Sequence, residues 1–198
     1  MRTIYFDCTG GVSGDMVLRA LEELGGHAYA HGRSYTEVKN IIDSAQEYAQ
    51  RIYRVLAEAE AEVHGETSET VHFHEVGRSE AIKNALGIGM ALSRLAADRI
   101  LVSSIYDGKG FVDCAHGRIA VPVPAVRAMM NKSDYDFRTA EGVDTEMVTP
   151  SGLASLMGIG AEPVPRGYTI TGNIIAVAKV KGTRDTGHEG LKALLIEE

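Results

Sequence analysis

Residues 3–15 are Thr3-Ile4-Tyr5-Phe6-Asp7-Cys8-Thr9-Gly10-Gly11-Val12-Ser13-Gly14-Asp15. The apolar run up to Cys8 predicts a buried strand, and the glycines after it predict a tight turn. A helix over 15–24 should follow, with Asp15 in its first turn, where a carboxylate lies favourably near the positive end of the helix dipole. The chain therefore opens with a strand, a Gly-rich loop and a helix, as α/β proteins often do.

The Gly-rich turn is a candidate ligand site, because backbone N–H groups before a helix can cradle an anion. Two familiar phosphate loops are excluded. A nucleotide P-loop needs Lys and then Ser or Thr where this chain has Asp15 and Met16, and a phosphatase loop needs Arg at position 14, which is Gly14. Carboxylates at Asp7 and Asp15 favour a metal-bridged phosphate or a cation. A tight turn capped by Asp explains the same residues equally well.

The remainder of the chain predicts a mixed α+β domain over 1–198, with a helical lobe at about 35–95. Between the expected strands, 108–117 is expected to be irregular, and the Ala-Glu alternation over 57–62 is interpreted as a solvated helix face. The further elements expected are a long helix or helical hairpin over 35–63, a helix over 79–95, a strand over 99–105, a helix over 124–130, a helix opening at 149–152, and a hairpin of strands over 168–180 and 191–196 in a mixed sheet.

Composition narrows the class of partner. The formal net charge of −7, without a Lys/Arg cluster, argues against nucleic acid as the main partner. The start of the chain lacks the apolar stretch of a signal peptide, and no segment reaches the length of a membrane span, so we expect a cytoplasmic protein with no membrane partner. In a reducing compartment Cys8 and Cys114 are expected to be free thiols or metal ligands.

Histidines supply the strongest local signal. His72 and His74 stand two residues apart in an extended segment, so their imidazoles point to one side, and Glu75 follows. Cys114 and His116 repeat that spacing. If the two segments meet, they offer a thiolate, imidazoles and a carboxylate, a set that suits Ni²⁺, Zn²⁺ or Cu²⁺. Surface histidines with no ligand are the alternative.

Two later segments place hydroxyls and charge where loops meet regular elements. Thr149 and Ser151 precede a helix, and Arg184 with Asp185 lies in the expected hairpin turn. A guanidinium can grip a carboxylate or phosphate bidentately. An N-cap and an Arg-Asp pair in a turn are the structural alternatives.

A series of motifs in one order along the chain resembles the LarC family. They are Tyr5-Phe6-Asp7-Cys8 with Gly11-Val12-Ser13-Gly14-Asp15-Met16, Val71-His72-Phe73-His74-Glu75-Val76-Gly77, Gly110-Phe111-Val112 with Cys114-Ala115-His116-Gly117, Val148-Thr149-Pro150-Ser151-Gly152, and Gly182-Thr183-Arg184-Asp185.

The resemblance implies insertion of nickel into pyridinium-3,5-bisthiocarboxylic acid mononucleotide, the precursor of the nickel-pincer cofactor, with consumption of CTP and a metal-chelatase activity of the lyase class. Ni²⁺ is the expected metal, with Mg²⁺ or Mn²⁺ as further candidates, and the chain is open to oligomerisation. The candidates carried over are, as catalytic residues, Asp7, Ser13 and Asp15; as cofactor-binding residues, Gly11, Gly14, Thr149, Ser151, Arg184 and Asp185; and as metal ligands, His72, His74, Glu75, Cys114 and His116.

The chain departs from the family in two informative ways. The family's nucleotide-using carboxy-terminal domain would follow Glu198, so we expect a separately encoded partner and do not assign CTP to this chain alone. After Gly77 the family continues with Ala-Val-Asp-Ser-Ile and a second Asp, where this chain has Arg78-Ser79-Glu80-Ala81-Ile82 and Asn84. A metal-binding or scaffold subunit without turnover and a Mg²⁺-dependent phosphate hydrolase are the rival hypotheses.

Overall fold

A mixed five-stranded sheet forms the centre of the protein. The computed structural model describes residues 1–26, 32–73, 76–114 and 117–198. The strand order is β7-β2-β1-β9-β8, with β1, β2 and β7 parallel and β9 antiparallel to both of its neighbours. The strands are β1 (Arg2–Asp7), β2 (Arg99–Val102), β7 (Glu162–Pro163), β8 (Asn173–Val180) and β9 (Leu191–Glu197).

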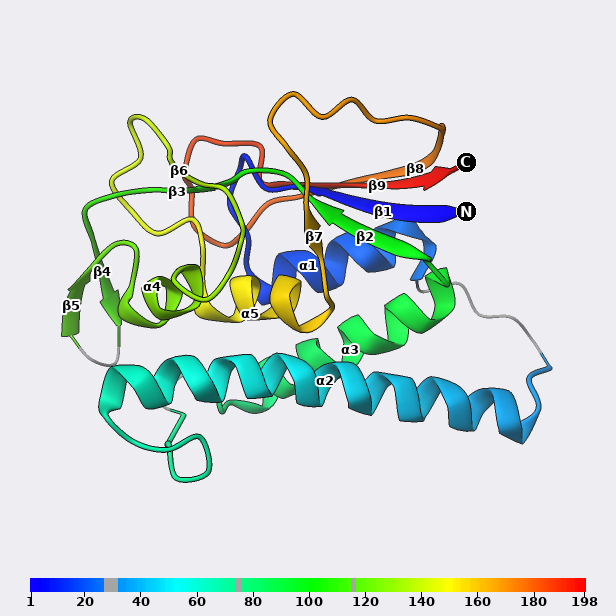
Figure 1. Cartoon of the computed structure of the whole chain (residues 1–198), viewed down its shortest axis with the longest axis horizontal. Helices are drawn as coiled ribbons and strands as arrows, with labels where there is room; N and C mark the ends of the chain where they lie inside the picture. Colours follow the sequence, from blue (N-terminus) through cyan, green and yellow to red (C-terminus); the bar gives the residue numbers. More distant parts are fainter. Residues whose placement is uncertain (27–31, 74–75, 115–116) are drawn as a thin grey trace.

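Strand β1 is buried in the middle of this sheet, and its side chains alternate between the two faces. Ile4 and Phe6 point into the core and are fully buried. Tyr5 points to the other face, where its ring stacks on Tyr168 at a centroid distance of 6.2 Å. One face of the sheet therefore takes the helices, and the segment between β7 and β8 crosses the other (Figure 1).

Helices lie below the sheet in the view of Figure 1, and α2 forms the outermost layer. Three of them begin with a hydroxyl cap: Ser13 accepts a hydrogen bond from the Met16 N–H in α1, Ser34 accepts one from the Glu37 N–H in α2, and Thr149 accepts one from the Gly152 N–H in α5. The helices are α1 (Gly14–Leu21), continued by the π-helical turn Glu22–Gly26, then α2 (Tyr35–His64), α3 (Ser79–Leu95), α4 (Pro124–Met130) and α5 (Pro150–Gly158).

Two small sheets extend the structure beyond the carboxyl end of β2. Strand β3 (Ile105–Asp107) pairs in parallel with β6 (Phe137–Thr139), and β4 (Phe111–Cys114) forms a hairpin with β5 (Gly117–Ala120). Both lie at the end of the molecule where the Gly-rich loop leaves β1 (Figure 1).

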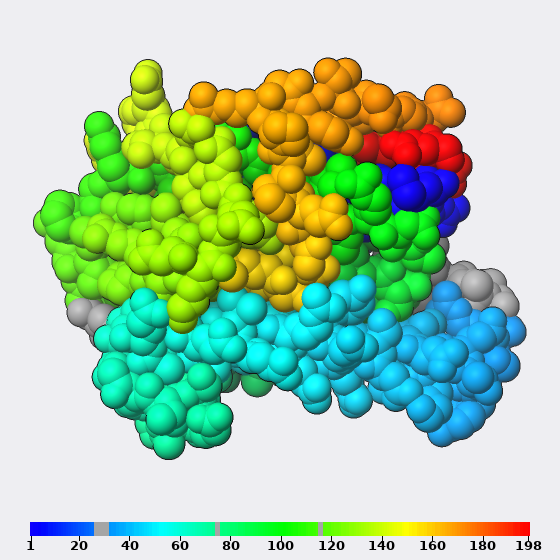
Figure 2. Space-filling model, viewed as in Figure 1, coloured from blue at the N-terminus to red at the C-terminus, as the bar shows by residue number. Residues whose placement is uncertain are grey.

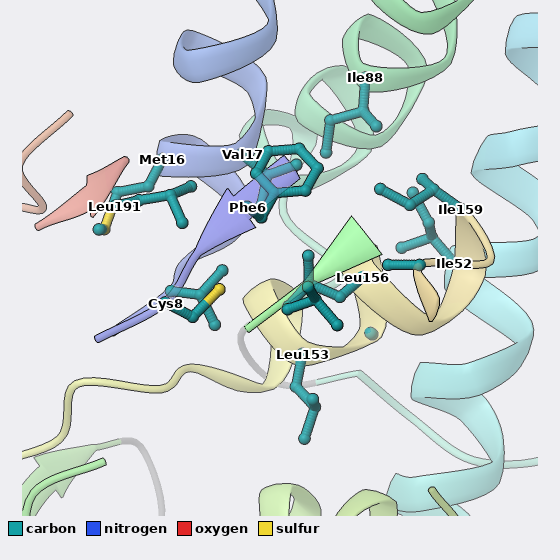
Figure 3. Close-up of a cluster of buried hydrophobic side chains, with 14 of the residues drawn as sticks. Phe6, Cys8, Met16, Val17, Ile52, Ile88, Leu153, Leu156, Ile159 and Leu191 are labelled. Carbon is teal, nitrogen blue, oxygen red and sulfur yellow. The ribbon is translucent and has the colours of Figure 1, made fainter. Parts of the chain in front are cut away.

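One hydrophobic core joins these elements. Phe6 from β1, Val17 from α1, Ile88 from α3 and Leu156 from α5 are fully buried in the same cluster, and Figure 3 shows these side chains gathered between the strands and the helices. Burying such side chains supplies about 1.5–3 kcal/mol each. Because four elements share the cluster, their relative positions are closely coupled.

Helix α2 spans the long axis of the molecule and closes one side of the core (Figures 1 and 2). It begins with a capping box between Ser34 and Glu37 and ends at Gly65 in the left-handed conformation, φ 68°. Its neighbours approach at glycines. A Cβ on Gly89 of α3 would lie 2.7 Å from the Ala45 Cα, and a Cβ on Gly158 of α5 would lie 2.7 Å from the Ile52 backbone.

The mixed α/β class is confirmed, as are the helices over 79–95 and 124–130 and the closing antiparallel strands. The helix expected over 35–63 is one continuous helix. The expectation of an irregular 108–117 is wrong, because residues 111–114 form a strand that pairs with 117–120. The final hairpin starts at Asn173, not at residue 168, and the first helix is capped by Ser13, not by an aspartate.

Replacing Gly89 by Ala should destabilise the fold by about 2 kcal/mol, because the new methyl group would meet the Ala45 backbone, which cannot move aside cheaply. Gly87→Ala in the same helix is the matched control. Its methyl group would meet only the flexible end of the Leu18 side chain, so a gain in helix propensity of up to about 1 kcal/mol offsets the contact. Urea unfolding of both variants measures the difference, and equal midpoints would contradict this packing.

Candidate functional site

Backbone pairing joins the Gly-rich loop to the segment before α5. The Val12 N–H donates to the Met147 carbonyl at 2.9 Å, and the Thr149 N–H donates to the Val12 carbonyl at 3.0 Å. Gly11, at φ 86°, allows this approach, since a Cβ there would lie 2.4 Å from the Met147 oxygen. The amino ends of α1 and α5 consequently start side by side.

Hydroxyl groups line the junction of these two helices. The Ser151 Oγ accepts a 3.4 Å hydrogen bond from the Gly14 N–H and lies 3.1 Å from the Thr149 Oγ1. Ser13 and Thr149 each cap their own helix at 3.2 and 3.1 Å. Helix capping, the structural alternative for these hydroxyls, is therefore present. Ser13, Thr149 and Ser151 also each border a cavity.

Asp107, at the end of β3, accepts hydrogen bonds from the backbone of the segment before α5. It is 4% exposed, and its Oδ1 accepts hydrogen bonds from the N–H groups of Gly108, Met147 and Val148 at 2.8–3.0 Å. Its Oδ2 has no hydrogen-bond partner among the described residues. Burial raises the pKa of this carboxyl above its ordinary value, and the three N–H donors oppose that rise only in part.

Three neighbouring cavities surround the junction. The largest, the Cys114 cavity, holds about 510 Å³, the Arg184 cavity about 380 Å³ and the Tyr53 cavity about 200 Å³. Glu146, Thr149 and Arg184 border both of the larger ones, whereas Ala81 and Ser151 border the largest and the smallest. The three spaces are therefore adjoining parts of one site.

The Cys114 cavity is lined by both polar and apolar residues. Cys114 is half-buried, and its Sγ donates a weak hydrogen bond to the Gly117 carbonyl at 3.4 Å. The polar walls are Glu60 and His64 of α2, Asp113 and Cys114 of β4, and Glu146, Thr149, Ser151 and Arg184; the apolar walls are Val63, Val76, Ala81, Val112, Ile119, Val123, Pro124, Ala125 and Pro150.

Glu60 and His64 were missed by the sequence prediction, which placed 57–62 on a solvated face. They stand one helical turn apart, with 3.5 Å between the Glu60 Oε2 and the His64 Nε2, and their side chains are only 16% and 26% exposed. The signal that could have found them is the i, i+4 spacing of a carboxylate and an imidazole on a helix whose alanines at 59 and 61 are buried.

Glu146 was also missed, although it lies only two residues before the Val148–Gly152 motif. Its side chain is 8% exposed and pairs with Arg184, whose side chain is 43% exposed. A buried carboxylate of this kind is costly without a cation beside it. The ion pair therefore fixes the turn between β8 and β9 against the segment before α5, at the boundary of the two larger cavities.

The predicted metal ligands are distributed unequally. Cys114 lines the Cys114 cavity, and so does Val76, the last but one residue of the motif that contains His72. His72 is exposed and does not border that cavity. His74, Glu75 and His116 lie outside the described residues. Within the described ranges no group of three or more His, Cys, Asp or Glu side chains is arranged to hold a metal ion, so the metal cluster stays a prediction.

Asp7 and Asp15, predicted as catalytic, have partners away from the three cavities. Asp7 Oδ1 accepts hydrogen bonds from the Thr9 N–H at 3.2 Å and the Thr9 Oγ1 at 2.8 Å. Asp15 forms an ion pair with Arg19 at 2.9 Å. Neither borders a cavity described above. Of the opening loop, Ser13 borders the Arg184 cavity and Gly14 the Tyr53 cavity.

Asp185 borders the Arg184 cavity, and its Oδ1 accepts a hydrogen bond from the Gly187 N–H at 3.1 Å. Thr149, Ser151 and Arg184 border the Cys114 cavity. Four of the six predicted cofactor-binding residues therefore line the Cys114 cavity or the Arg184 cavity beside it.

Comparison with known proteins identifies the family of the chain. The sequence model of the family described as "Nickel insertion protein" matches residues 26–195. The chain belongs to the nickel insertion protein family. No solved structure matches it significantly. Among the described residues, every helix is too short or too polar to span a lipid bilayer.

Curated relatives from this family are longer than the chain. The "Pyridinium-3,5-bisthiocarboxylic acid mononucleotide nickel insertion protein" of Acetivibrio thermocellus is 32% identical, over 83% of this chain and 54% of the relative. A "Putative nickel insertion protein" of Geobacter sp. is 35% identical over the same shares. The protein of Lactiplantibacillus plantarum that bears the first name is 29% identical, over 100% of this chain and 62% of the relative. The chain spans about half the length of the first two.

Asp107→Asn should change how stability depends on pH. Because the folded state raises the pKa of this carboxyl, the unfolded chain releases the proton first, and the stability of the wild type falls as pH rises above the ordinary value of 3.8. Asn cannot ionise, and its amide oxygen still accepts hydrogen bonds. Denaturant unfolding at several pH values should therefore show the stability of the wild type minus that of the variant decreasing as pH rises. A constant or increasing difference would contradict the burial argument.

The two thiols should differ in reactivity. Cys8 is fully buried, and burial raises the pKa of its thiol, so little reactive thiolate forms. Cys114 borders a cavity. In the native protein a thiol reagent such as Ellman's reagent should modify one cysteine quickly, and Cys114→Ser should abolish that fast phase while Cys8→Ala leaves it intact. A fast phase that survives Cys114→Ser would refute this assignment.

Proposed function

We propose that this chain takes part in the insertion of nickel into pyridinium-3,5-bisthiocarboxylic acid mononucleotide, in the cytoplasm. The observation that carries the proposal is the Cys114 cavity, which Cys114 lines together with Glu60 and His64 of α2. Membership of the nickel insertion protein family and the names of the relatives support it. Free cysteines fit a reducing compartment.

Nickel is a substrate in this proposal, and the protein binds it only transiently. A thiolate at Cys114 suits a borderline-soft divalent ion, and imidazole suits nickel equally well. We propose Cys114 as the principal ligand, with His72, His74, Glu75 and His116 retained as candidate partners. The sulfur atoms of a bis-thiocarboxylate offer the ion softer ligands than carboxylate oxygen, so transfer proceeds by exchange of ligands inside the cavity.

The precursor would occupy the same space. Thr149 and Ser151 present hydroxyls, and Arg184 presents a guanidinium that can bind an anionic group. The apolar residues of the cavity suit the face of a pyridinium ring. Because Asp7 and Asp15 are engaged with Thr9 and Arg19 and line none of the three cavities, the proposal gives them no step. The Mg²⁺-dependent hydrolase, which would use these two carboxylates, remains a rival hypothesis.

Use of CTP, and of Mg²⁺ or Mn²⁺ with it, belongs in our proposal to residues equivalent to the rest of the longer relatives.

Equilibrium dialysis against Ni²⁺, Zn²⁺ and Mg²⁺ tests the metal-binding part. Cys114→Ala should weaken Ni²⁺ binding about tenfold or more, because a thiolate ligand is lost, whereas Cys8→Ala should leave it unchanged. His72→Ala and His116→Ala show whether the neighbouring imidazoles contribute. Binding should weaken at lower pH, since thiolate and imidazole ligands bind metal only when deprotonated.

The outcomes separate the rival hypotheses. Ni²⁺ binding that ignores Cys114 and both histidines would refute the proposed ligands. Tight Ni²⁺ binding without transfer to the precursor, even with a supplied carboxy-terminal domain, would identify a metal-binding subunit. Preference for Mg²⁺, unaffected by these substitutions, would favour the hydrolase.

A further inference from the structure

The Arg184 cavity differs in chemistry from the cavity that holds the thiol. Its walls carry two permanent cations, Lys181 and Arg184, together with His188 and hydroxyls such as Thr183 and Ser13. Glu146 and Asp185 line the same space, so its permanent charges balance although the whole chain has a formal charge of −7. An anion would bind there through a cation that neither carboxylate engages.

The turn that carries these cations is held in one shape. Asp185 Oδ1 accepts from the Gly187 N–H at 3.1 Å, and Thr186 Oγ1 accepts from the His188 N–H at 3.4 Å. The Lys181 carbonyl accepts a hydrogen bond from Arg19 of α1. At the other end, Gly190 packs against Gly10, where a Cβ would lie 2.1 Å from the Gly190 oxygen. The turn is thereby fixed beside the Gly-rich loop.

The carboxylates that line the Arg184 cavity do not pair with both of its cations. Glu146 is engaged with Arg184, and one oxygen of Asp185 is engaged in the turn itself. Lys181 is exposed and lines the cavity, and its ammonium has no ion-pair partner among the described residues. Arg184 has five N–H donors in a planar fork, so it can serve Glu146 and a second anion together.

We infer that the Arg184 cavity binds the phosphate monoester of a pyridine mononucleotide, with Lys181 and Arg184 as its cationic contacts, while the ring lies in the adjoining Cys114 cavity. This assignment rests on the proposed function for the identity of the ring. It adds Lys181 and the turn over 181–190 to the site, and it gives the boundary residues Arg184, Thr149 and Glu146 a position between the two ends of one ligand.

Isothermal titration calorimetry without nickel tests this subsite. The probes are nicotinic acid mononucleotide, which has the ribose phosphate but no sulfur, and nicotinic acid riboside, which lacks the phosphate. We expect the mononucleotide to bind the wild type at least about tenfold more tightly than the riboside, and its affinity to fall with added salt. CTP, the other phosphate source, should bind more weakly than the mononucleotide.

Lys181→Met should weaken mononucleotide binding about five- to tenfold and leave riboside binding unchanged, because one charge-assisted contact is lost. Lys179→Met is the matched control: Lys179 lies two residues earlier, borders none of the three cavities and pairs with the exposed Glu189 at 3.2 Å. It should change mononucleotide affinity less than twofold. Thermal unfolding verifies that both variants are folded.

Equal affinities for mononucleotide and riboside, no saturable binding of the mononucleotide at millimolar concentration, equal effects of the two lysine variants, or tighter binding of CTP would each overturn the assignment. Because the titration contains no metal, its result is independent of the nickel dialysis. Mononucleotide binding that depends on Lys181, in a protein that binds no nickel, would keep the subsite and refute the proposed function.

Discussion

The whole site depends on a few backbone hydrogen bonds between Val12 and the segment Met147–Thr149. They require a glycine at position 11, because a Cβ there would meet the Met147 oxygen. They also require the Asp107 carboxylate, which accepts hydrogen bonds from the Met147 and Val148 N–H groups. Because N–H groups buried without acceptors are costly, this arrangement leaves the two helix starts little freedom. Every cavity described above borders at least one residue at the start of α1 or α5, among them Ser13, Gly14, Thr149 and Ser151.

Distant parts of the chain then complete the walls. Helix α2 brings Glu60 and His64 from one side, and the turn between β8 and β9 brings Lys181 and Arg184 from the other. Figure 1 shows these parts on opposite sides of α5. The shared core holds them in place, together with the Glu146–Arg184 ion pair. The Cys114 cavity and the Arg184 cavity thus become neighbours, although some 70 residues separate Cys114 from Arg184 in the sequence.

Local chemistry made much of the fold predictable. The helices at 79–95 and 124–130 follow from apolar periodicity and from a proline in the first turn, both of which act over a few residues. The hairpin at 111–120 was missed because each strand has only four residues, and its stability comes from cross-strand pairing rather than from its own composition. Glu60 was taken for a surface residue because the alternation of Ala and Glu does not reveal which side of α2 meets another element.

The sequence alone determined the family resemblance, the order of the main elements and the residue types that suit a soft metal and an anion, because motifs and caps depend on neighbours in the chain. Only the tertiary structure decided which of these residues share a space. In the folded chain Asp7 contacts Thr9, and Asp15 contacts Arg19. Glu146 is buried against Arg184, and Lys181 lies beside the Gly-rich loop. The reason is physical: side chains far apart in the sequence meet only when burial of a common apolar core outweighs the entropy of closing the loops between them.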